Sequence, residues 1–122
     1  MRPAEAVVAL AVPRGIAARF DPGAAGDLDA VLELRLARTE VRYAVSVAGG
    51  RCVVERRAAP DARAHVTISA GDIVRLITGT IEWTALLAAG RLQLGGDPFL
   101  ALRFPALFGF GRAQPSLSGT SR

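Results

Sequence analysis

Hydrophobic and polar positions alternate along the first half of the chain. Leu32, Leu34 and Leu36 point one way, while Glu33 and Arg35 point the other. A period of two is the pattern of a half-buried strand. The same alternation returns twice more before residue 58 and once after it, which predicts strands over residues 32–36, 41–47, 51–57 and 65–69. Four strands with short connections predict an antiparallel meander that is apolar on one face.

The period becomes helical after Ser69. A broad apolar face over residues 70–78 predicts a helix, which Ser69 and Asp72 open with the form of a capping box. Gly79 is expected to end this helix, and Thr80 to cap a second one over residues 81–89. Gly90 is expected to end this second helix in the left-handed backbone conformation. Residues 92–94 then alternate as a fifth strand.

Prolines set the limits of the two outer helices. Asp97 followed by Pro98 predicts a capped helix start, and Pro105 is expected to end that helix near residue 104, with a short kinked turn over residues 106–110. Pro13 and Gly15 limit an N-terminal helix to about residues 4–12, before a loop over residues 21–27. We therefore expect one domain over residues 1–110 and a flexible tail over residues 111–122.

Composition narrows the function classes. All 15 basic residues are arginine, which excludes Schiff-base chemistry and a P-loop lysine. The net charge of +4 permits transient contact with an anionic membrane surface, but the arginines are scattered and aromatic residues are few, so no nucleic-acid partner is expected. No apolar run is long enough to span a bilayer and no leader is recognised, which predicts a cytoplasmic protein.

Catalytic chemistry is sparse. One cysteine, Cys52, and one histidine, His65, cannot form a zinc-finger type of metal site within one chain. Cys52 is read as a small buried side chain, with a reactive thiol beside Arg51 as the alternative, and His65 is expected to point outward. Asp72, Glu82 and Asp97 stand at helix starts, where carboxylates serve as caps. We therefore expect no enzyme, no metal and no cofactor.

The run from residue 65 to residue 97 carries a more specific pattern. It contains a strand ending in Ser69, an acidic-starting helix with Gly79, an alanine-containing helix, Gly90 with the short strand over residues 92–94, and the sequence Gly95-Gly96-Asp97. This order, followed by a closing helix, resembles the sterol carrier protein 2 (SCP2) family of lipid-binding domains. The resemblance implies an α+β fold in which a five-stranded, largely antiparallel sheet carries helices packed over one face.

The resemblance also implies a function. We expect non-catalytic binding or transfer of a hydrophobic lipid-like ligand, such as a sterol, fatty acid, acyl-CoA or isoprenoid, in a tunnel between the sheet and the helices. Tyr43 and Trp83 each have a polar atom that would orient such a ligand. The expected lining residues are Leu34, Tyr43, Val45, Ile73, Ile77, Trp83, Leu86, Leu87, Phe99, Leu102 and Phe108.

A second interpretation has no ligand. The groove would then be filled by the chain's own side chains, and the domain would act as an accessory module or homodimer through an exposed apolar patch near residues 104–110. Under the first interpretation the chain is a monomer or a weak homodimer.

Overall fold

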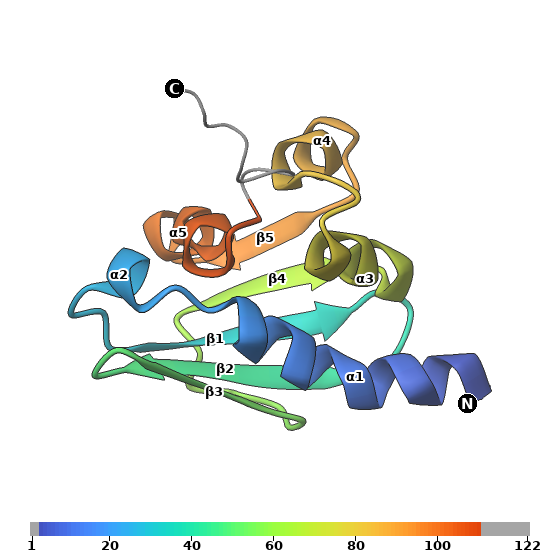
Figure 1. Ribbon diagram of the computed structural model, residues 1–122. Coiled ribbons are helices and arrows are strands. Elements are labelled where there is room, and N and C mark those ends of the chain that lie inside the picture. Colours follow the sequence, from blue (N-terminus) through green and yellow to red (C-terminus); the bar gives the residue numbers. More distant parts are fainter. Residues whose placement is uncertain (1–2, 111–122) are drawn as a thin grey trace.

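A twisted five-stranded sheet carries the helices on one face (Figure 1). The structure is a computed structural model that describes residues 3–110. Its elements, in chain order, are α1 (Pro3–Arg19), α2 (Pro22–Ala25), β1 (Ala30–Leu36), β2 (Arg42–Ala48), β3 (Arg51–Glu55), β4 (Ala64–Ile68), α3 (Ala70–Thr78), α4 (Trp83–Ala88), β5 (Gln93–Gly96) and α5 (Pro98–Phe108). The expected α+β fold, with helices over one face of a five-stranded sheet, is confirmed. The expected tail over residues 111–122 lies outside the described residues.

The sheet is mixed, with strand order β3-β2-β1-β4-β5. The expected meander is wrong at one step, because β4 pairs with β1, in parallel, and not with β3. The chain between β3 and β4 must therefore cross from one side of β1 and β2 to the other. A parallel pair always needs such a crossover, and nothing in the local alternation of residues reports it.

Glu33 holds this crossover in place. Its carboxylate accepts a hydrogen bond of 2.7 Å from the backbone N–H of Ala59, in the middle of the connection, and one of 2.6 Å from Arg35. The backbone N–H of Arg63 also donates to the carbonyl of Val31 at 2.9 Å. Glu33 points away from the helices, so the connection packs against the second face of the sheet and buries this carboxylate.

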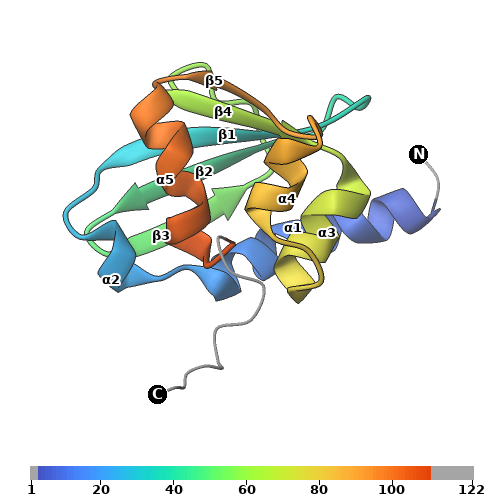
Figure 2. The same cartoon turned by 90° about the horizontal axis from the view of Figure 1, so that it is seen from above.

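The apolar face of the sheet forms the core with the helices. The register places Leu32 beside Val45, and Leu34 between Tyr43 and Val66, and all five side chains are fully buried. Seen from above, α5 and α4 lie across this face, with α3 beside α4 (Figure 2). The alternation read from the sequence therefore identified the buried face correctly.

Helix α1 continues through Pro13 to Arg19, so the expected end near residue 12 is wrong. Proline costs about 3 kcal/mol inside a helix, and tertiary contacts here offset that cost. Val12 and Ile16, on either side of Pro13, are fully buried. At the helix end, Arg19 donates to the carbonyls of Phe108, Ile77 and Gly109, each at 2.9 Å, and so joins α1 to the ends of α3 and α5.

The start of α4, the end of α5 and the segment over residues 22–25 also differ from expectation. Thr80 does not cap α4; its backbone N–H and hydroxyl donate to the carbonyl of Arg75 at 2.8 and 3.2 Å, which closes the end of α3. Helix α5 passes Pro105 and ends at Gly109, where φ is +68°. Residues 22–25, expected as loop, form the single turn α2. The caps at Ser69 and Asp97 are confirmed, since each side chain accepts a backbone N–H of the helix that follows.

Gly15 allows α1 to approach α3 closely. A Cβ atom there would lie 2.8 Å from Cγ2 of Ile77, closer than two carbon atoms can approach without displacement. We predict that Gly15→Ala lowers the free energy of unfolding by about 1–3 kcal/mol, although alanine favours helix elsewhere. Gly71→Ala is the control. A Cβ atom there would lie 3.6 Å from Nη1 of Arg75, an ordinary contact, so this substitution should raise the free energy of unfolding slightly. Urea unfolding of both variants measures these changes. In the double variant Gly15→Ala with Ile77→Ala, we expect part of the lost stability to return. Equal effects of Gly15→Ala and Gly71→Ala would contradict the close packing.

Glu33 makes stability depend on pH. Burial raises the pKa of Glu33, but the hydrogen bonds from Ala59 and Arg35 and the positive charges of Arg35 and Arg42 outweigh it, so the pKa lies below its ordinary value. The stabilisation is therefore present above the unfolded-state pKa of about 4.3 and is lost as the pH falls through the folded-state pKa. Glu33→Gln should cost about 1–3 kcal/mol at neutral pH and much less near pH 3, measured by urea unfolding. Glu55→Gln, on an exposed ion pair, is the control, and a pH-independent loss in Glu33→Gln would contradict this role.

Candidate functional site

An aromatic cluster fills the space between α5 and α4. The ring of Phe104 lies 5.5 Å from Trp83, 5.0 Å from Phe108 and 6.0 Å from Phe110. Ring pairs at these separations attract beyond the effect of burial alone. The expected interaction patch over residues 104–110 is therefore wrong as an exposed surface, because its four large apolar side chains, Phe104, Leu107, Phe108 and Phe110, are buried.

The predicted lining residues divide into two groups. Seven of them meet in the buried layer between sheet and helices, and an eighth, Ile77, is half-buried against that layer. The other three, Leu87, Phe99 and Leu102, are exposed at 42%, 80% and 57%. The seven buried residues are Leu34, Tyr43, Val45, Ile73, Trp83, Leu86 and Phe108.

Tyr43 brings a phenol hydroxyl into this buried layer. Its side chain is fully buried, on the helix-facing side of β2 beside Leu34. Burial raises the pKa of Tyr43, and the positive charge of Arg56 opposes the rise. The phenol is therefore neutral at physiological pH and has the chemistry of a hydrogen-bond donor.

A small apolar groove opens between β5 and α5. Its volume is about 180 Å³, and Leu94, Gly95, Gly96, Pro98, Ala101 and Leu102 line it. Leu94 is paired with Val66, which belongs to the buried helix-facing side of the sheet. The groove is therefore at the rim of the apolar layer, where the edge strand meets the first turns of α5. Sequence reasoning named Leu102 but not the others. Glycine, alanine and proline carry no hydrophobic pattern, and Leu94 was assigned only to the short fifth strand.

A second pocket is polar. It has a volume of about 520 Å³ and lies where β1 and β4 end, between the β1–β2 turn, the start of α3 and the chain entering β5. Its polar walls are Arg38, Thr67, Ser69, Asp72, Arg91 and Gln93. Sequence reasoning identified Ser69 and Asp72 as a cap but not this pocket, because Arg91 is 19 residues from Asp72.

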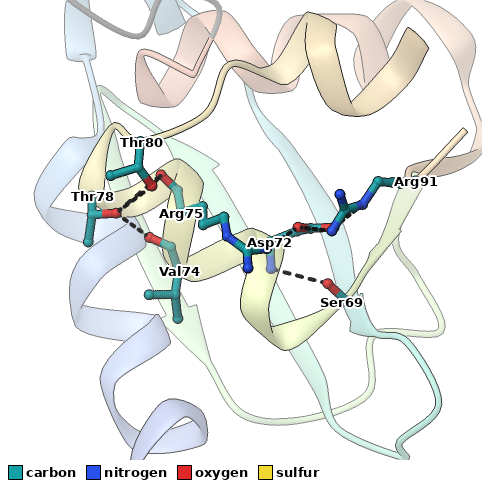
Figure 3. A network of polar contacts seen from close by, with 7 residues as sticks. All are labelled: Ser69, Asp72, Val74, Arg75, Thr78, Thr80 and Arg91. Carbon is teal, nitrogen blue, oxygen red and sulfur yellow. Dashed lines mark hydrogen bonds and ion pairs between the residues drawn. The ribbon is translucent and has the colours of Figure 1, made fainter. Parts of the chain in front are cut away.

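Asp72 organises the polar pocket (Figure 3). Asp72 is 1% exposed, and its carboxylate accepts hydrogen bonds from Nε and Nη2 of Arg91 at 3.0 and 2.7 Å and from Nη1 of Arg75 at 2.8 Å. The backbone N–H of Asp72 donates to Ser69 Oγ at 3.1 Å. The capping box is thus confirmed at its serine, whereas the carboxylate joins α3 to the start of the β5 segment.

The two nucleophilic or basic side chains do not come together. Cys52 lies on the helix-facing side of edge strand β3, paired with Val47, whereas His65 lies on the opposite side of β4, paired with Glu33 and Gly95. Burial lowers the pKa of His65, and Arg35 adds to this while Glu33 opposes it. Within residues 3–110, no three metal-ligating side chains are grouped as a metal site. His65 is outward, as expected.

One protein family matches most of the chain. Residues 17–109 match the profile of the SCP-2 sterol transfer family. No curated protein sequence matches the chain. No helix of the described residues is both long and apolar enough to cross a membrane.

Solved structures share the fold. A UbiJ-SCP2 ubiquinone synthesis protein superposes with a TM-score of 0.65 at 19% identity over 90% of this chain and 100% of its own. Palmitated SCP2L2 from Aedes aegypti gives 0.65 at 20% identity over 80% of this chain and 90% of its own. The sec-alkylsulfatase Pisa1 from Pseudomonas sp. gives 0.64 at 17% identity over 80% of this chain. This chain spans only 15% of that sulfatase.

Cys52 should react slowly. Burial raises the pKa of its thiol to about 11, which is opposite to the lowering that a reactive thiol beside Arg51 requires. At pH 8 the thiolate fraction, and with it the alkylation rate by iodoacetamide, should be about one hundredfold below that of an ordinary thiol. Mass spectrometry of native and urea-unfolded protein measures the two rates. Equal rates, or faster reaction of the native protein, would contradict the half-buried, protonated state of the thiol.

Proposed function

The chain belongs to the SCP-2 sterol transfer family, and from this premise we propose that it binds and transfers a single lipid-like molecule without covalent chemistry. The ligand classes that suit such a domain are sterols, fatty acids, acyl-CoA and isoprenoids. The family match over residues 17–109 is the observation that carries the proposal.

The architecture supports this function. The large buried apolar side chains of the sheet, Leu32, Leu34, Val45 and Val66 among them, face the helices, and the α5–β5 groove meets this layer at Leu94. At about 180 Å³ the groove is smaller than the roughly 300 Å³ of a typical ligand pocket, so the ligand needs more room than this form offers. We propose that the first turns of α5 move outward to admit it.

Energetics permit a useful affinity. Burial of about 300 Å² of apolar ligand surface would contribute about 7 kcal/mol, which the entropic costs of association reduce. Micromolar binding, at about 8 kcal/mol net, therefore requires a ligand that buries more apolar surface than this. Leu102, which is exposed and lies on the groove wall, offers the apolar surface that first contacts the ligand. A palmitated relative makes a fatty acyl chain the first ligand to test.

Native mass spectrometry of the protein purified from cells, followed by solvent extraction, tests the proposal directly. We expect a bound apolar molecule of defined mass, displaced by an added fatty acid. Repeated purification without a ligand, together with no uptake of a fluorescent fatty acid, would contradict the proposal. A stable dimer of ligand-free protein would instead favour the accessory-module interpretation.

A charge at the groove should block uptake. Leu102→Glu places a carboxylate on the groove wall, where binding of an apolar chain would desolvate it, so affinity for a fluorescent fatty acid should fall at least about tenfold. Val53→Glu is the matched control, because Val53 is 54% exposed, against 57% for Leu102, and lies on β3 at the far edge of the sheet. Equal effects of the two substitutions on probe binding would remove the groove from the proposal.

A further inference from the structure

The polar pocket at the end of β1 and β4 has a net positive charge. Asp72 is its one buried carboxylate, and Arg75 and Arg91 both bind it. Arg38, on the β1–β2 turn, lines the pocket together with Arg91 and Asp72, and the charges of these three residues sum to +1. Arg75 binds Asp72 without lining the pocket and brings the sum of the four residues to +2. Glu40 stands nearby in the sequence, but within the described chain neither Glu40 nor any other carboxylate pairs with Arg38.

The donors of the pocket are held in place before any ligand arrives. Nε and Nη2 of Arg91 form a two-pronged contact with Asp72, which fixes the guanidinium plane and leaves its remaining N–H groups for another acceptor (Figure 3). Ser69 accepts a hydrogen bond from the backbone of Asp72, so its hydroxyl proton can be donated elsewhere. Thr67 and Gln93, paired across β4 and β5, bring a hydroxyl and an amide to the same wall.

Arg38 occupies a backbone position that arginine rarely takes. Its φ is +61°, the left-handed region that favours glycine, and it is the one such non-glycine residue in the described chain. Its side chain is exposed at the pocket, and within the described residues it has no ion-pair partner. The turn alone would be built more easily with glycine.

We propose that this pocket binds a phosphate group, carried either by a soluble phosphate ester or by the headgroup of a lipid. Two guanidinium groups, from Arg38 and Arg91, match the charge and the several acceptor oxygens of a phosphate monoester. The volume of about 520 Å³ leaves room for the group that carries the phosphate. This inference goes beyond the proposed lipid function and does not depend on it, because the pocket and the α5–β5 groove share none of their lining residues.

Titration of the full chain with glycerol 3-phosphate tests the site, followed by calorimetry and by amide chemical shifts in NMR. We expect saturable binding, shifts at Arg38, Ser69 and Arg91, and weakening by added salt. Arg38→Gln should lower the affinity about tenfold or more, since a hydrogen bond to a charged group is lost. Arg51→Gln is the matched control and should leave binding unchanged, because Arg51 is also exposed and begins β3, next to the β2–β3 turn at the opposite end of the sheet.

A second variant separates binding from folding. Arg38→Gly removes the guanidinium and relaxes the left-handed backbone, so it should melt no lower than the wild type while binding as weakly as Arg38→Gln. A parallel arm measures sedimentation with vesicles of phosphatidylcholine that contain phosphatidic acid, against vesicles of phosphatidylcholine alone.

The arms distinguish the two sources of phosphate. Binding to glycerol 3-phosphate alone assigns the site to soluble esters, whereas Arg38-dependent binding to phosphatidic acid vesicles alone assigns it to lipid headgroups. Both results support a phosphate site. Absence of binding in both arms, or equal loss in Arg38→Gln and Arg51→Gln, would overturn it. Uptake of a fluorescent fatty acid should not change in Arg38→Gln, so failure of this inference is distinguishable from failure of the lipid proposal.

Discussion

Burial of one sheet face against the helices is the constraint on which the rest of the structure depends. An open sheet of five strands exposes an apolar surface that water disfavours, and here α1, α3, α4 and α5 supply the covering layer (Figure 1). The layer is fastened at one point by Arg19, whose guanidinium binds carbonyls at the ends of α3 and α5. It is open at another, where the short edge strand β5 meets α5. The Arg19 contacts stabilise the layer, and the α5–β5 groove is the candidate route by which a ligand enters it.

Local patterns gave most of the elements, because their causes are local. Alternation identified the buried side of β1 and β2, and side-chain caps marked the starts of α3 and α5. The failures have a common physical source. The parallel pairing of β1 with β4 is held by Glu33 across 26 residues, and the helices that pass Pro13 and Pro105 are held by tertiary contacts of their flanking side chains. Neither a register nor a packing contact between distant segments is visible in a short window of sequence.

The sequence predicted that apolar residues gather between the sheet and the helices, but not which of them are exposed or where a polar pocket forms. Apolar spacing named seven residues that meet in the buried layer, since a helical stripe and a strand face both report burial. The same spacing could not tell the inner side of α5 from its outer side, and Phe99 and Leu102 are exposed. The polar pocket depends on Arg91 reaching Asp72 from another segment, and on one left-handed residue, Arg38, at a turn. Such sites form only when the fold brings charges together, and they are invisible to periodicity.

The proposed function requires a lipid-like ligand between the sheet and α5. Isotope-filtered NMR measures this most directly, by detecting contacts between an unlabelled fatty acid and the ¹³C-labelled methyl groups of the protein. We predict contacts to Leu94, Ala101 and Leu102 at the groove, continuing to Val66 on the buried face. Contacts only to exposed methyl groups elsewhere, such as those of Val53, or none at all under saturating ligand, would contradict the account.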